Sequence, residues 1–470
     1  MHRKNDRLKK GEKERKMSST KFYTRGSRIG RRDFLKLMGA GAASLGIAGI
    51  AGCGPKPTEA PPPTPAGPIS LDFIVWSYGI ETILDNIEKC EAAYGNAFEV
   101  SLKDIAWGEY HESMVARFTA KTPTDVCYNG GDWLPEFAKA GWVVPLEDYF
   151  PQALDYKPDI VGYALSDITY NGKLYGLPYY SDITSFQYNK KLLEESGVEG
   201  PPETWEELTD QLEFLKGKGF DPPMALEIAV EMPTTFDNFT AMAYGRGGEW
   251  FDENFDPLFE DPAGPLGQQL QWMVDNYKAG LVTYLPHETE VQKQLNTGQT
   301  IYAVLWNYNI AALNSADVSP LAGQYDIALM PGATHETQGM AKMYNMTQMA
   351  VDRGQEVMDA CWKFIEYFAG KYEGEYKVAE RWAVEKGLGF GIMPLYDAPD
   401  VQEAFASFVS PDKLKEQAAL ARARRHPEWE GIFNEFALVQ IVSAATGEIS
   451  VEEAIESMAN KAKELKEQYA

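Results

Sequence analysis

The chain has 470 residues and carries 44 Lys and Arg against 69 Asp and Glu, a net charge of −25 at pH 7. This length is enough for two or three domains' worth of buried core. An acidic surface of this kind repels nucleic acids and anionic lipids, so we expect neither as a partner.

Cysteine and histidine usage gives little sign of chemistry. The four cysteines are Cys53, Cys90, Cys127 and Cys361. Neither they nor the five histidines have the spacing of a metal site, so we expect no metal and no cofactor. The last three cysteines fall in apolar segments and are predicted to be buried free thiols.

Residues 1–52 have the three parts of an export signal. Arg31 and Arg32 precede an apolar run, residues 37–52, that ends directly before Cys53. The arginine pair resembles a twin-arginine signal. The end of the run resembles a lipobox, in which the cysteine is acylated and becomes the first residue. The alternative is a transmembrane anchor, but a helix of this length spans about 24 Å, less than the ~30 Å hydrocarbon core.

Cleavage before Cys53 would leave residues 53–470, with 30 basic and 65 acidic residues and a net charge of −35. Residues 53–68 would then form a lipidated cysteine and a proline-rich tether, which we expect to be stiff and extended. The protein would be held on the outer face of the cell membrane, at the cell surface or in the periplasm.

From residue 69 onward, strands and helices alternate. Strands are predicted at 71–76, 98–105 and 125–128, and helices at 80–94, 109–119 and 133–140. This alternation indicates an α/β fold with a parallel sheet, in which ligands bind beyond the carboxyl ends of the strands. The polar and aromatic candidates at those ends are Trp76, Tyr78, Trp107, Glu109, Asn129, Asp132 and Trp133.

The middle of the chain carries clear turn and cap signals. The Asn171-Gly172 pair predicts a hairpin over residues 170–178. Thr204 followed by Glu207 predicts a helix that begins with a capping box. Further helices are predicted at 190–196, 236–244, 265–278 and 357–368, and further strands at 184–188, 300–305 and 325–330.

Several of these segments occur in a familiar order. The lipobox, Leu177-Pro178 after the hairpin, and the segments 188–193 and 202–208 together resemble the family 1 extracellular solute-binding proteins of ABC importers. The resemblance extends over nearly all of residues 69–470. It implies a two-lobed periplasmic-binding-protein-like fold (type II) with the ligand cleft between the lobes and a crossover hinge.

Mapped onto this chain, the resemblance implies one lobe from residues 69–181 plus 332–395 and another from 185–328 plus 398–470. It also implies that the protein is not an enzyme. A monomer would capture a small solute and deliver it to the transmembrane subunits of a permease.

The resemblance adds further ligand candidates. Sugar sites combine aromatic faces with carboxylate or amide groups. Asp132 matches an acidic position of the family, whereas Asn129 and Trp133 replace an aromatic residue and an arginine. The other candidates are Tyr180 and Asp182 in the first crossover, Trp306, Asn307 and Tyr308 after a strand, and Tyr344 and Asn345 in a methionine-rich loop. A late aromatic pair of the family maps near Asn434 and Glu435.

Several of the candidate ligand residues could instead have purely structural roles. Asp132 could cap a helix, Trp133 and Tyr180 could be core, and Asp182 could be a solvated hinge residue.

Three functions compete: carbohydrate binding for an importer, binding of a cation such as a polyamine or betaine, and glycoside hydrolysis by paired carboxylates. Under the first, Asp132→Ala and Tyr308→Ala should weaken binding and leave the melting temperature of the apo protein nearly unchanged.

Overall fold

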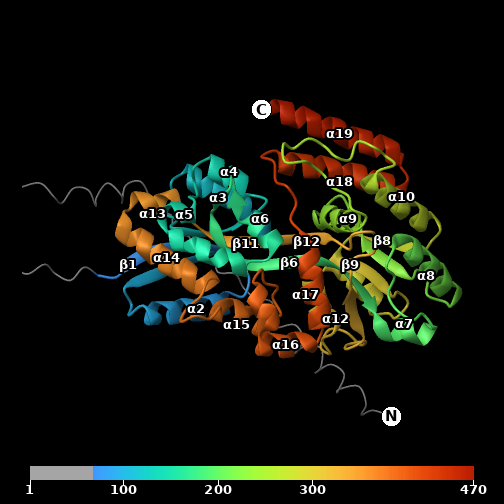
Figure 1. Cartoon of the computed structure of the whole chain (residues 1–470), viewed down its shortest axis with the longest axis horizontal. Helices are drawn as coiled ribbons and strands as arrows, with labels where there is room; N and C mark the ends of the chain where they lie inside the picture. The colour runs from blue at the N-terminus through green and yellow to red at the C-terminus, as the bar shows by residue number, and fades with distance from the viewer. Residues whose placement is uncertain (1–66, 470) are drawn as a thin grey trace, which may run out of the picture. The chain divides into compact units, whose positions relative to one another are not determined.

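The computed structural model describes residues 67–469 (Figure 1). The predicted signal peptide, Cys53 and nearly all of the tether lie outside these residues. No helix within residues 67–469 is both long enough and apolar enough to cross a membrane.

The strands and helices follow one another as the alternating pattern predicts. The strands are β1 (Ile69–Trp76), β2 (Phe98–Ile105), β3 (Val126–Gly130), β4 (Thr169–Tyr170), β5 (Lys173–Leu174), β6 (Gly176–Asn189), β7 (Met224–Glu227), β8 (Val282–Leu285), β9 (Tyr302–Trp306), β10 (Tyr325–Ala328), β11 (Thr337–Met346) and β12 (Ala421–Arg422). The helices of the first half are α2 (Ile80–Ala93), α3 (Trp107–Thr119), α4 (Leu134–Lys139), α5 (Leu146–Tyr149), η1 (Pro151–Asp159), α6 (Gly162–Asp167), α7 (Lys190–Ser196), α8 (Trp205–Gly217) and α9 (Thr234–Gly245). Those of the second half are α10 (Pro265–Lys278), α11 (Glu288–Leu295), α12 (Tyr308–Leu313), α13 (Gln348–Asp352), α14 (Gln355–Ala369), α15 (Lys377–Lys386), η2 (Met393–Asp397), α16 (Pro399–Ala406), α17 (Pro411–Leu420), α18 (Glu430–Thr446) and α19 (Val451–Gln468).

One long strand, β6, joins two sheets. Its first part pairs antiparallel with β11, which continues through β3 and β1 to β2. Its second part pairs antiparallel with β9 and β10, and β9 continues to β7 and β8. The exchange of partners falls between Ile183, paired with Gly339, and Thr184, paired with Trp306. In Figure 1, α2, α3 and α14 lie to one side of β6, and α8 and α10 lie to the other.

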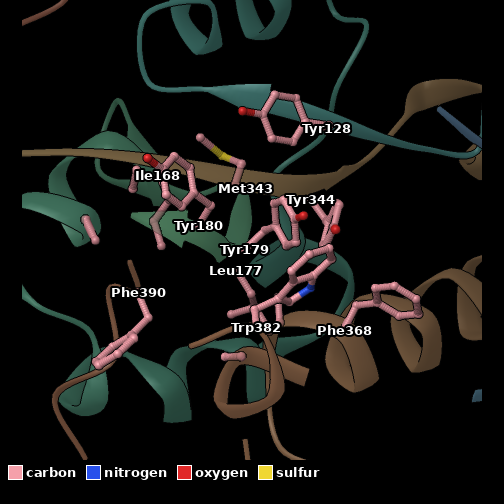
Figure 2. Packing of buried hydrophobic residues seen from close by; sticks show 14 of the residues in the cluster. Tyr128, Ile168, Leu177, Tyr179, Tyr180, Met343, Tyr344, Phe368, Trp382 and Phe390 are labelled. Atoms are coloured by element: carbon pink, nitrogen blue, oxygen red, sulfur yellow. The ribbon is translucent and has the colours of Figure 1, made fainter. Parts of the chain in front are cut away.

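Two hydrophobic cores flank this exchange. Core 1 includes Phe73, Tyr344 and Trp382, and core 2 includes Trp205 and Phe433. Figure 2 shows aromatic packing in core 1, where the rings of Tyr179 and Tyr344 lie 4.6 Å apart. The predicted lobe limits stay a prediction, because core 1 also takes in buried side chains of β9 and β10.

The structure agrees closely with the element bounds, turn and helix cap that the sequence predicts. Strand 98–105 and helices 190–196 and 265–278 have the predicted bounds. Asn171 and Gly172 form the turn between β4 and β5 with φ of 50° and 78°. The capping box is formed in part: Thr204 Oγ1 accepts from the Glu207 N–H, but the Glu207 carboxylate accepts from Glu203. Cys90, Cys127 and Cys361 are buried free thiols, as predicted.

The prediction of a methionine-rich loop around Tyr344 and Asn345 is wrong. Both residues lie in β11, which pairs with β3 and with β6 and is therefore an interior strand. Tyr344 is fully buried among core aromatics, and the Asn345 amide donates to the Tyr175 carbonyl at 2.8 Å. The Tyr344 side chain packs in core 1, and the Asn345 side chain binds a backbone carbonyl.

Candidate functional site

A cavity of about 670 Å³ is lined by side chains from both cores. Core 1 contributes Tyr128 and Tyr180, and core 2 contributes Phe236 and Leu438. The volume lies within the range of about 300–1,000 Å³ found for small-molecule sites. Because the opposite walls belong to different cores, a molecule in the cavity touches both.

One wall of the cavity is aromatic. It is built at the carboxyl ends of neighbouring strands, because β1 pairs with both β2 and β3 and the three run parallel. Trp76 stacks on Tyr78 at 5.0 Å between ring centroids, Trp107 lies 5.6 Å from Trp76, and Trp133 lies 5.2 Å from Trp107. We call these four residues the aromatic wall. Trp107 is 47% exposed and offers the most open ring of the four to a ligand.

A buried lysine supports this wall. Lys342 on β11 lies with its Nζ 5.3 Å from the Trp107 ring and 5.1 Å from the Trp133 ring, and it pairs with Asp132 at 2.8 Å. A Cβ on Gly130 would collide with both charged groups, so the pair needs a glycine there. Burial alone would raise the pKa of Asp132, but the Lys342 ammonium outweighs it and lowers that pKa.

A second ionic cluster forms the other end of the lining. His426 contacts Asp167 through Nε2 at 3.1 Å and Glu430 through Nδ1 at 2.6 Å. Arg424 pairs with Asp237 at 2.5 Å and with Glu430 at 3.2 Å. Burial would lower the pKa of His426, but the carboxylates of Glu430 and Asp167 outweigh it and raise the pKa to about 10. We call these five residues the histidine cluster; its imidazole is a cation at neutral pH.

Tyr308 and Asp182 meet near the crossover. Asp182 is buried and accepts hydrogen bonds from the Tyr180 hydroxyl at 3.0 Å and from the Tyr308 N–H at 3.3 Å. Burial raises its pKa to about 7. Tyr308 is 38% exposed and its hydroxyl donates to Glu288. Asp182 therefore holds two cavity residues in place and is not the solvated residue of the alternative interpretation.

The structure brings together eight of the fourteen predicted ligand residues. Those that line the cavity are Trp76, Tyr78, Trp107, Asp132, Trp133, Tyr180, Trp306 and Tyr308. Asn434 and Glu435, placed by the resemblance, line it as well. Five of the seven candidates at strand ends thus line the cavity, as the rule for parallel sheets predicts.

Six predicted residues do not line the cavity. Besides Tyr344, Asn345 and Asp182, these are Glu109, Asn129 and Asn307. Glu109 is exposed on α3. Asn129 is fully buried in β3, where its side-chain oxygen accepts from the Gly130 N–H. Asn307 is buried at the start of α12. Each of these three residues lies one or two positions from a lining residue, and its side chain does not reach the cavity.

The charged lining residues were mostly missed. They are Asp167, Asp237, Lys342, Lys386, Arg424, His426 and Glu430. Lys342 is the charged residue of β11 and is flanked by Met340, Ala341 and Met343, a pattern that signals a buried functional charge. Arg424 and His426 lie between β12 and α18 and carry no local signal that separates them from an exposed loop.

Two hydrophobic cores, a strand that passes between them and a cavity that both line define a solute-binding protein. A model of the bacterial extracellular solute-binding protein family matches residues 54–373, and the chain belongs to this family. The prediction from the resemblance is thereby confirmed. The family is one of solute-binding proteins and not of enzymes, in agreement with what the resemblance implies.

Similarity to individual relatives is distant. A maltotriose-binding protein of Pyrococcus abyssi is 24% identical over 50% of this chain and 49% of its own length. A putative binding protein of Brucella abortus is 25% identical over 33% of this chain and 37% of its own length. The chain thus spans half or less of the length of these relatives.

The solved structures that resemble the chain share its fold. MalE of Xanthomonas citri, a sugar-binding protein, superposes with a TM-score of 0.71 at 20% identity, over 85% of this chain and 98% of the other. Maltose-bound MalE3 of Thermotoga maritima superposes with a TM-score of 0.69 at 21% identity, over 84% and 100%. The predicted two-lobed α/β fold is therefore confirmed.

Proposed function

We propose that the protein is the lipid-anchored solute-binding component of an ABC importer and that it binds a carbohydrate, either a sugar, an oligosaccharide or a polyol. The observation that carries this proposal is one cavity lined by both the aromatic wall and the histidine cluster. Aromatic faces suit the C–H faces of sugar rings, and fixed charged groups suit hydroxyls.

The charges of the cavity favour a neutral guest. Within residues 67–469, every charged lining side chain except Glu435 belongs to an ion pair. An anionic solute would have to break one of these pairs or remain without a partner, and a cationic solute would find only the Glu435 carboxylate unpaired; an unpaired charge in a closed site is costly. Hydroxyl groups can share paired carboxylates and ammonium groups without displacing them.

The same geometry weighs against the cation alternative. A polyamine or betaine would use the rings of the aromatic wall as a cage. The Lys342 ammonium already lies over Trp107 and Trp133 and is neutralised by Asp132. The protein's own cation thus occupies the most favourable position for a cationic ligand.

The names of several relatives agree with a carbohydrate, although one relative is named as a probable amino-acid transporter component. They include proteins that bind maltotriose, diacetylchitobiose and mannitol. Because these ligands differ, we propose only that the ligand is a carbohydrate and do not propose a particular sugar. A ligand that touches both cores would favour the closed arrangement, because only there does it gain both sets of contacts. We propose delivery to permease transmembrane subunits by the closed monomer.

Trp107→Ala tests the site. We expect it to weaken sugar binding about tenfold, because stacking on an aromatic ring contributes roughly 0.5–1.5 kcal/mol beyond the area buried. The apo melting temperature should change little, since the ring is 47% exposed. Calorimetry against mono-, di- and oligosaccharides and polyols measures the loss. Phe214→Ala, at a ring 44% exposed outside the cavity, is the matched control.

Two outcomes would contradict this assignment. If the wild-type protein gives no binding heat with any sugar or polyol, the carbohydrate class is wrong. If sugar binds and Trp107→Ala binds it equally well, the aromatic wall is not the binding surface.

Cys53→Ser tests the anchor. We expect wild-type protein, made in a host with lipoprotein processing, to sediment with membranes, because the acyl chains are buried in the bilayer. The serine variant should be found in the soluble exported fraction. Replacing Arg31 and Arg32 by lysine tests the export route separately. Retention of the serine variant on membranes would mean that the chain is held by something other than a lipid on Cys53.

A further inference from the structure

A second cavity lies beside the first. It has a volume of about 550 Å³ and shares Asp167, Arg424 and His426 with the first. The histidine cluster is therefore a partition with one cavity on each side. Asp167, Arg424 and His426 thus present atoms to both cavities.

The lining of the second cavity repeats the chemistry of the first. It includes Tyr170 from the β4–β5 hairpin, Phe255 and Trp429, and Tyr469 after α19. Tyr469 is 45% exposed. Aromatic rings again stand beside polar side chains such as Asn171 and Asn254.

The second cavity also lies between parts of the chain that belong to different cores. Leu134 belongs to core 1 and Trp429 to core 2. An ion pair between Lys139 on α4 and Glu428 closes its edge. A guest there would touch both cores, as a guest in the first cavity does, and would favour the same closed arrangement.

We propose that the second cavity is a subsite for the outer end of the same ligand, and that the guest is an oligosaccharide longer than a disaccharide. This inference rests on the proposed carbohydrate function. Each cavity alone has the volume of a small-molecule site, so a single sugar or polyol leaves most of the space unfilled. Every charged side chain of the partition already belongs to an ion pair, so a neutral chain of rings can lie against it without displacing a partner.

The test compares chain lengths. Calorimetry of the wild-type protein uses maltose with maltotetraose, cellobiose with cellotetraose, and diacetylchitobiose with its tetrasaccharide. In the series that binds, we expect the tetrasaccharide to bind at least about tenfold more tightly than the disaccharide, equivalent to one additional stacking contact. Tyr469→Ala should remove most of this difference and leave disaccharide affinity unchanged.

Tyr170→Ala is a second variant on a different element, and Tyr149→Ala, at a tyrosine 38% exposed outside both cavities, is the control. Equal affinity for short and long members of the binding series would overturn the inference, and so would equal losses for both lengths in the two variants. Either result leaves the carbohydrate function intact. Failure of every sugar to bind the wild-type protein would instead overturn the proposed function, and the inference with it.

Discussion

Asp132→Ala should lower the free energy of unfolding of the apo protein by about 1–3 kcal/mol, below the range for a fully buried ion pair because the Asp132 side chain is 31% exposed. The reason is Lys342, whose side chain is only 6% exposed and whose ammonium pairs with Asp132. Without the carboxylate, two indole rings remain as the neighbours of that charge. Denaturant unfolding of the apo protein measures the loss. This result replaces the sequence-based expectation that Asp132→Ala leaves the melting temperature unchanged.

Two further variants distinguish the loss of the Asp132–Lys342 ion pair from the loss of an aspartate side chain in general. Asp155→Ala, at an exposed aspartate in η1 outside the cavities, should change stability by less than about 0.5 kcal/mol. Combining Asp132→Ala with Lys342→Met should recover part of the loss, because the stranded charge is removed together with its partner. An unchanged stability in Asp132→Ala would mean that Lys342 reaches water or another partner and that the pair does not hold the wall.

Topology explains why the aromatic wall could be predicted. Each of its members follows or ends one of the strands β1, β2 and β3, which run parallel to one another and so present their carboxyl ends at one edge. The periodic pattern located the strands, and the rule then located Trp76, Trp107 and Trp133. No knowledge of the ligand was needed for this step.

The histidine cluster could not be predicted in the same way. Its members lie far apart in the sequence: Asp167 at the end of α6, Asp237 on α9 and Glu430 on α18. Their meeting depends on long-range packing of both cores around β6 and β11. The prediction of a loop at Tyr344 was wrong for a related reason. The sequence of β11 contains methionines and lacks a strict alternation of apolar and polar residues, so the strand is recognised only from its pairing partners.

His426 provides the second large effect. Its folded pKa of about 10 lies above the unfolded value of 6.5, so the folded state binds the extra proton more tightly. The stabilisation is fully present below pH 6.5 and is lost as pH rises through about 10. A shift of this size corresponds to at most about 5 kcal/mol. We therefore expect the wild-type protein to lose stability progressively between these two pH values.

His426→Gln isolates this contribution. Glutamine can still donate to one carboxylate, but it brings no positive charge between Asp167 and Glu430. The difference in unfolding free energy between wild type and variant should be largest below pH 6.5 and should shrink towards pH 10. The two proteins share every other titrating group, so that difference reports on His426 and its carboxylate partners. A difference that stays constant over this range would mean that the imidazole is not held as a cation and that the partition between the two cavities is uncharged at its centre.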